Sequence, residues 1–330
     1  MTNPMEDLET GRGGDAALRR PSARRWLTAG LVVALLAAIA VHLSRERDEL
    51  LDLSRVSTTV LLAAAGCQLA AQLLWNAAML LPLRTFMARL GYWELFMVRT
   101  GGFVAGYLVP VASLAVRMGY LKVRGLGYAQ TAWATAVSNV LALFAGGLLA
   151  VLALGGLWVV AGSLSLSVVG LTAAVLALGI AGVVVLWYLP RLAGHPRLGR
   201  WPRLSRLSGF TTSRGTLGWV LALLLARHGF NFFTFGLLFQ SLSPVPLGVL
   251  SGGFVYAITS PVRVLIITPG NLGVNEWLVA AVANTLSVDL TTGLVVALVF
   301  RAVSLAGQGV GVVIGAAWLA LRGGSDRPAA

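Results

Sequence analysis

The sequence is poor in the residues that build metal centres and disulfides. Its 330 residues include one cysteine, Cys67, and three histidines, His42, His195 and His228, that lie far apart in the chain. A single cysteine excludes an internal disulfide, and the scatter of these side chains gives no metal-ligand spacing. We therefore expect no metal and no other cofactor.

Acidic residues are also scarce, with 12 Asp and Glu against 25 Lys and Arg, which gives a net charge of +13. Only 11% of residues are charged, 57% are hydrophobic, and the mean hydropathy is +0.83. This composition is typical of a polytopic membrane protein. The basic residues stand mostly in short runs beside apolar stretches, so the positive-inside rule explains them better than nucleic-acid binding. We expect no nucleic-acid partner.

Six apolar stretches are long enough to cross a membrane as helices. They are Trp26–Leu43, Val56–Leu81, Tyr128–Leu154, Leu164–Leu189, Thr216–Gln240 and Thr292–Leu321. Basic runs at their ends predict a multi-pass protein of the cytoplasmic membrane with both termini in the cytoplasm. Residues 1–25 are expected to be a disordered cytoplasmic tail, residues 26–322 the membrane domain, and residues 323–330 a second tail.

Two further apolar regions are too broken by proline and glycine to be simple spans. Tyr92–Arg124 contains Pro110 and carries basic residues at both ends, so we interpret it as a re-entrant hairpin entering from the cytoplasm. Here Arg99 is counted with Arg84 and Arg89 as a basic residue on the cytoplasmic side. The stretch Thr259–Glu276 lies between the last two spans and is interpreted as a hairpin entering from the outer side.

The two hairpins stand at matching positions in two halves of the chain, about residues 56–154 and 216–321. The predicted fold is therefore an all-α polytopic membrane protein with about six full transmembrane helices plus two re-entrant helical hairpins in an inverted repeat. Broken segments at matching positions of two halves indicate a transport site near the middle of the membrane.

Polar side chains also occur inside two of the expected spans. Gln68, Gln72 and Asn76 share one helical face, either to form hydrogen bonds between helices or to line a polar cavity. Arg227 is interpreted as snorkelling to the cytoplasmic interface.

The second hairpin has the chemistry of an anion site. Glycines allow a ligand to approach the backbone, and a helix that begins near Val274 would direct its N–H groups at an anion. Glu276 is expected to pair with Arg301 or Arg263, which leaves excess positive charge; the alternative is that these groups only hold the hairpins in place. The predicted substrate-binding residues are Arg117, Lys122, Arg263, Gly270, Asn271, Gly273, Asn275, Glu276, Arg301 and Gln308, with no catalytic residue.

The run Pro269-Gly-Asn-Leu-Gly-Val-Asn-Glu276 resembles the Pro-Gly-x-Leu-Gly-x-x-Glu signature of the lysylphosphatidylglycerol synthase/flippase transmembrane domain. Arg301, in Val-Phe-Arg-Ala-Val, and the Pro110…Arg117 segment are similar to two further motifs of that family. The resemblance covers about residues 26–321 and implies translocation of a phospholipid, a modified phospholipid or a polyprenyl-phosphate-linked lipid between leaflets. We expect no synthase domain.

Three functions remain open from the sequence. The first is the flipping or scrambling of an anionic phospholipid or lipid-linked phosphate, with the headgroup held between the two hairpins. The second is a membrane enzyme acting on a lipid-linked substrate, with Glu276 as general base, and the third is an accessory subunit. No nucleophile stands beside a base and no acidic pair suits Mg²⁺, so we expect a transport protein and not an enzyme. Expected partners are membrane lipids with anionic headgroups, and either further copies of the chain or a separate lipid-modifying enzyme.

Overall fold

The computed structural model describes Val41, Ser44 and residues 56–108, 112–161, 166–193, 210, 212–243, 248–261 and 271–323. Both tails and nearly all of the first expected span lie outside these residues. So do the tips of both expected hairpins, which hold Pro110, Arg263 and Gly270.

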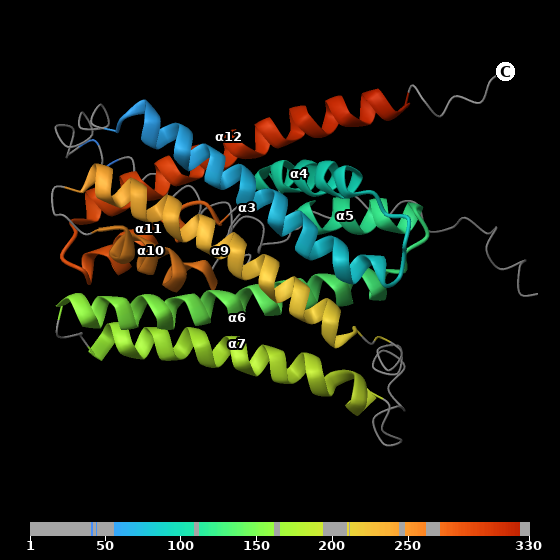
Figure 1. Ribbon diagram of the computed structural model, residues 1–330, viewed down its shortest axis with the longest axis horizontal. Helices are drawn as coiled ribbons and strands as arrows, with labels where there is room; N and C mark the ends of the chain where they lie inside the picture. Colours follow the sequence, from blue (N-terminus) through green and yellow to red (C-terminus); the bar gives the residue numbers. More distant parts are fainter. Residues whose placement is uncertain are drawn as a thin grey trace, which may run out of the picture.

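Long helices run side by side along the longest axis of the molecule (Figure 1). Within the described residues, five are long and apolar enough to cross a membrane. They are α3 (Thr58–Arg84), α6 (Tyr128–Ala161), α7 (Leu166–Ala193), α9 (Arg214–Leu242) and α12 (Leu290–Gly323). They correspond to the second to sixth expected spans, which confirms an all-α membrane architecture for this part of the chain.

Two pairs of short helices lie at opposite ends of this bundle. The first pair is α4 (Tyr92–Leu108) and α5 (Ala112–Val123), and the second is α10 (Gly248–Thr259) and α11 (Val274–Asn284). Figure 1 shows α4 and α5 in one half of the length of the molecule and α10 and α11 in the other. Each pair therefore covers only part of the length of the bundle.

Side chains at the helix ends explain where several of these elements begin. Ser57 accepts a hydrogen bond from the Val60 N–H at 3.3 Å, and Ser213 accepts one from Thr216 at 3.1 Å, so each serine caps a long helix. Asp289 accepts from the Thr292 N–H at 2.7 Å and does the same for α12. Gly125, with φ +96°, stops α5 in a conformation that favours glycine.

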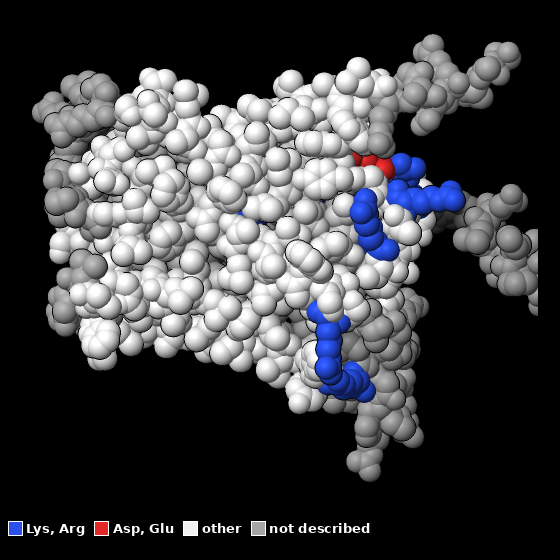
Figure 2. Space-filling model, in the orientation of Figure 1, with Lys and Arg blue, Asp and Glu red and all other residues white. Residues whose placement is uncertain are grey.

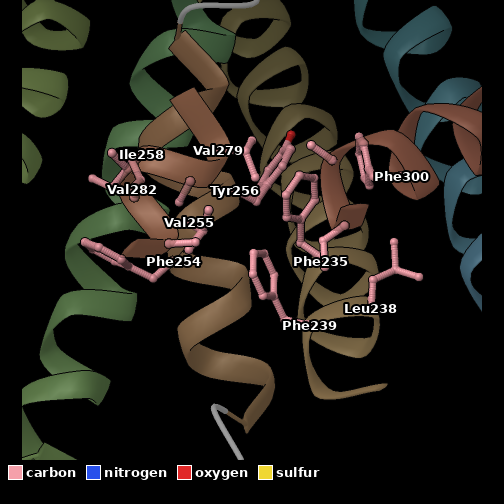
Figure 3. Close-up of a cluster of buried hydrophobic side chains, with 14 of the residues drawn as sticks. Phe235, Leu238, Phe239, Phe254, Val255, Tyr256, Ile258, Val279, Val282 and Phe300 are labelled. Atoms are coloured by element: carbon pink, nitrogen blue, oxygen red, sulfur yellow. The ribbon is translucent and has the colours of Figure 1, made fainter. Parts of the chain in front are cut away.

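An aromatic core joins α9, α10 and α12 (Figure 3). The ring centroids of Phe235 and Phe300 are 4.3 Å apart, and those of Phe235 and Tyr256 are 5.5 Å apart. Behind these rings, α9 and α10 approach so closely that a Cβ on Gly236 would lie 2.5 Å from the Val249 carbonyl oxygen. Helix α10 is thus tightly packed against the two long helices α9 and α12.

The exposed charges mark one end of the bundle. Of the lysines and arginines whose side chains are described, the exposed ones are Arg84, Arg89, Lys122, Arg124, Arg191 and Arg214. Figure 2 shows basic side chains gathered at one end of the molecule, together with an acidic one, whereas the rest of that face is almost free of charge. An uncharged belt with basic residues at one end is the surface expected of a protein that crosses a membrane.

Candidate functional site

Four arginines and one glutamate lie inside the bundle. Arg99, Arg117, Arg227 and Arg301 are largely withdrawn from the surface, and Glu276 is 1% exposed. The other described acids are Glu94 at the basic end and the exposed Asp289. Four positive charges therefore face one negative charge in the described interior. Ionisable groups at such depth are costly and are the first place to look for function.

Glu276 and Arg301 form a buried ion pair at the start of α11. Arg301 Nη2 lies 2.5 Å from Glu276 Oε1, and the Gly273 N–H donates to Glu276 Oε2 at 2.7 Å. Arg301 Nη2 also approaches the Asn271 carbonyl oxygen at 3.4 Å. Asn271 and Gly273 both have positive φ, +52° and +81°, so the carboxylate holds a tight turn at the helix N-terminus. This pair is neutral as a whole.

The remaining predicted residues of the second half lie close to this pair or outside the description. Asn275 is 6% exposed in the first turn of α11, and Gln308 is 5% exposed on α12, two turns beyond Arg301. The structure thus brings Asn271, Gly273, Asn275 and Glu276 together with Arg301. Arg263 and Gly270 belong to the undescribed segment.

The other three interior arginines form what we call the arginine cluster: Arg99 on α4, Arg117 on α5 and Arg227 on α9. Arg99 lies within electrostatic range of both Arg227 and Arg117, and no described carboxylate lies in that range. Along their helices, Arg227 stands about 20 Å from the start of α9 and Arg99 about 10 Å from the start of α4. These depths place the arginine cluster well inside the bundle.

Helix α3 supplies the partners of the arginine cluster. Arg99 donates to the Gln72 side-chain and backbone oxygens at 3.0 and 3.2 Å. Arg117 Nη1 lies 3.6 Å from Met79 Sδ, and the Arg227 guanidinium stacks 4.0 Å from the centre of the Trp75 ring. These are neutral groups, so they support the side chains without cancelling their charge.

Lys122 does not join the arginine cluster. It is exposed at the basic end, where its ammonium lies 4.8 Å from the centre of the Tyr128 ring. Of the residues predicted in the first half, only Arg117 points inward.

The polar face of α3 forms hydrogen bonds between helices, as one of the two interpretations predicts. Gln68 donates to Asn231 Oδ1 at 2.8 Å and accepts from Ser304 at 2.8 Å, which ties α3 to α9 and α12. Asn76 donates to the Tyr92 carbonyl at 2.8 Å. Gln72 bonds the arginine cluster, so the same face also forms one side of it.

A second buried polar pair lies next to the arginine cluster. His228 Nδ1 and the Tyr256 hydroxyl are 2.8 Å apart, and Tyr256 also lies within electrostatic range of Arg227. Figure 3 shows Tyr256 among the aromatic side chains between α9 and α10. A Cβ on Gly146 would lie 2.8 Å from Ser260 Oγ, so this glycine lets α6 approach the end of α10 closely.

Sequence reasoning missed two members of the arginine cluster. Arg99 is expected at the cytoplasmic surface and Arg227 is expected to snorkel there, but the structure turns both toward α3. The available signal is position: Arg227 lies thirteen residues beyond the Arg214 helix start, too deep for its side chain to reach the end of α9. Trp75, one turn from Gln72 on α3, offers the stacking surface.

A family model described as the lysylphosphatidylglycerol synthase TM region matches residues 26–311. The chain belongs to this family. The family match spans the described helices from α3 through most of α12, including both pairs of short helices. Comparisons with curated proteins and with solved structures give no match.

Potential metal ligands are not grouped in the described part of the chain. There, no group of three or more His, Cys, Asp or Glu is placed to hold a metal ion. The chemistry that these residues do offer is the binding of an anion by guanidinium groups in a setting of low polarity.

Proposed function

We propose that this protein moves an anionic phospholipid or a lipid-linked phosphate between the two leaflets of the cytoplasmic membrane. The headgroup is held between the α4–α5 and α10–α11 hairpins, while the acyl chains stay in the bilayer. The basic end of the bundle faces the cytoplasm, and so do both termini.

The single observation that carries the proposal is the arginine cluster. Three guanidinium groups from three helices lie inside an apolar bundle, and the one described interior acid, Glu276, is already paired with Arg301. Buried cations need counter-charge, and guanidinium groups bind phosphate oxygens through two parallel hydrogen bonds. A lipid phosphate supplies that charge and brings its own apolar chains into the membrane.

The arrangement of the short helices supports transport. The α4–α5 pair reaches inward from the basic end and α10–α11 from the opposite end, as an inverted repeat requires (Figure 1). Half-crossing helices that meet near the middle of a membrane are typical of transporters, in which one half moves against the other. The glycine-rich run before Glu276 is not followed by the Lys-Ser/Thr of a nucleotide loop, so the proposed movement is passive or driven by an ion gradient.

The test is a translocation assay with purified protein in phosphatidylcholine vesicles. The probe is phosphatidylglycerol with a fluorescent acyl chain, and dithionite quenches the probe in the outer leaflet. We expect dithionite to quench about half of the probe in protein-free vesicles and nearly all of it with the protein present. Arg117→Gln and Arg227→Gln should slow translocation about tenfold or more, because each removes a charge-assisted hydrogen bond of about 1.5–3 kcal/mol.

The matched control is Arg214→Gln, which removes an exposed arginine from the same helix as Arg227. This variant should move the probe at the wild-type rate. Quenching with the wild-type protein that equals that of protein-free vesicles would overturn the proposed function.

A further inference from the structure

The arginine cluster has more charge and more donors than its surroundings use. Arg99 bonds one residue, Gln72, and its Nε is buried without a hydrogen-bond partner. Arg117 Nε is likewise buried and unpaired, and its one described contact with an acceptor is a thioether sulfur, which accepts only weakly. The Arg227 guanidinium lies over the Trp75 ring, which is a neutral partner and leaves its charge uncompensated.

We propose that the arginine cluster selects a lipid whose headgroup ends in a terminal phosphate, a phosphate monoester or a pyrophosphate, over the phosphodiester of ordinary phospholipids. This inference rests on the proposed function and names the substrate class of the same site.

Charge gives the first reason. The arginine cluster carries three positive charges, and the described groups within its electrostatic range include no acid. A phosphodiester brings one negative charge and leaves two positive charges uncompensated at low polarity, where such charges are costly. A phosphate monoester above its second pKa of about 6 brings nearly two charges, and a pyrophosphate brings two or more.

Geometry gives the second reason. The three guanidinium groups belong to three helices, α4, α5 and α9, and Arg99 lies within electrostatic range of the other two. A terminal phosphate presents three free oxygens, which is one for each arginine, whereas a phosphodiester presents two because its other two oxygens are esterified. Three guanidinium groups therefore match a terminal phosphate in number as well as in charge.

The surface around the arginine cluster favours a lipid as the source of this phosphate. Away from the basic end, the face in Figure 2 is uncharged except for a small basic area near its middle. A headgroup attached to acyl chains reaches such an area from the side of the membrane. A free phosphate ion offers the same terminal oxygens, so the test must separate the two sources.

The test compares three lipids with fluorescent acyl chains in the same phosphatidylcholine proteoliposomes. The probes are phosphatidic acid, which has a phosphate monoester, phosphatidylglycerol, which has a charged phosphodiester, and phosphatidylcholine, which is zwitterionic. At pH 7.5 we expect phosphatidic acid to cross about tenfold or more faster than phosphatidylglycerol, since each charge-assisted hydrogen bond is worth about a factor of ten in affinity. Arg99→Gln, Arg117→Gln or Arg227→Gln should reduce this preference, whereas Arg214→Gln should keep it.

A pH series tests the charge argument with the wild-type protein alone. Below pH of about 6 the monoester carries one charge, as phosphatidylglycerol does, so the preference should shrink as the pH falls. Phosphatidylglycerol keeps its charge over this range, so its rate reports any effect of pH on the protein itself. The uncharged polar groups near the arginine cluster are His228, Tyr256 and Tyr92.

The outcomes separate this inference from the proposed function. Equal rates for phosphatidic acid and phosphatidylglycerol at pH 7.5 would overturn the terminal-phosphate assignment and leave lipid translocation standing. If no lipid moves faster than in protein-free vesicles, both fail. A parallel assay follows uptake of radiolabelled inorganic phosphate and pyrophosphate; uptake of either without lipid movement would overturn the lipid source.

Discussion

The Glu276 side chain makes two interactions, one with the backbone and one with Arg301. Its carboxylate caps the first turn of α11 through the Gly273 N–H and neutralises Arg301, and it is almost completely buried. Breaking one side of a buried ion pair is costly because the other charge stays behind without a partner. A single variant of Glu276 therefore removes the carboxylate cap and leaves Arg301 unpaired at the same time. A double variant that also removes the Arg301 charge separates these two effects.

Glu276→Gln should lower the free energy of unfolding by about 3–5 kcal/mol, because it leaves Arg301 buried and unpaired. The double variant Glu276→Gln/Arg301→Gln should recover a large part of this loss, since no uncompensated charge remains. The measurement is thermal unfolding in detergent, followed by the fluorescence of the ten tryptophans. Asp289→Asn is the control, because asparagine also caps a helix well; a double variant no more stable than the single one would contradict the ion pair.

Glu94 should make the first hairpin sensitive to acid. It lies at the exposed basic end, outside the long helices, where burial would raise its pKa. Hydrogen bonds from Tyr120, Arg124 and the Gly91 N–H outweigh that effect and hold the pKa below its usual 4.5. A carboxyl whose pKa is lower in the folded state stabilises folding above its unfolded pKa, and this contribution is lost as the pH falls through the folded value.

We therefore expect the ends of α4 and α5 to exchange amide hydrogens faster at pH 3 than at pH 6, after correction for the intrinsic exchange rates. Glu94→Gln should remove most of this difference, because glutamine does not titrate. If the wild type and Glu94→Gln respond to acid in the same way, the loosening must come from another group.

At the scale of the element, the contact between α9 and α10 is made by glycine. Gly252 of α10 approaches Gly236 of α9 so closely that a Cβ on Gly252 would lie 3.0 Å from the Gly236 Cα. A Cβ on Gly236 would in turn meet backbone atoms of Val249, which cannot rotate away as a side chain can. The close packing of α10 against α9 thus requires that Gly236 and Gly252 carry no side chain.

Gly236→Ala should destabilise the protein by about 1–3 kcal/mol, because α10 must shift to admit the methyl group. Gly229→Ala on the same helix is the matched control, since a Cβ there meets nothing within 4 Å and alanine favours a helix. The measurement is the unfolding temperature in detergent. If the Gly236→Ala protein were as stable as Gly229→Ala, the close contact between α9 and α10 would not be needed for stability.

The sequence predicts the elements well and their inward-facing residues less well. Charge on the flanks of Tyr92–Arg124 favours a hairpin, and the structure has α4 and α5 there, with Glu94 and Arg124 paired at its open end. The same argument from flanking charge predicts the wrong position for Arg99. A basic residue near an expected helix end has the same sequence pattern whether its side chain faces water or a neighbouring helix. Only the packing of α3 against α4 and α9 turns Arg99 and Arg227 inward.

At the scale of the whole molecule, the exposed basic end predicts the orientation in the membrane. Lys122 lies at that end and Thr58 at the start of α3, at the opposite end (Figure 1). In a Cys67→Ala background, Thr58→Cys should react with a membrane-impermeant maleimide in intact cells. Lys122→Cys should react only after the membrane is opened. The reverse pattern would place the basic end outside and contradict the proposed orientation.

The depth of the arginine cluster also exposes it to the electrical potential across a living membrane. An elementary charge that crosses 100 mV changes its energy by about 2.3 kcal/mol, and a group partway across feels part of that drop. With the cell interior negative, the electrostatic energy of an anion falls when it moves from the cytoplasmic face toward the arginine cluster. It rises when the anion moves to the arginine cluster from outside. The resting voltage would thus favour binding of the anion from the cytoplasmic side. The occupied arginine cluster is close to neutral, so voltage would have little effect on later movement of the bound headgroup with the arginine cluster.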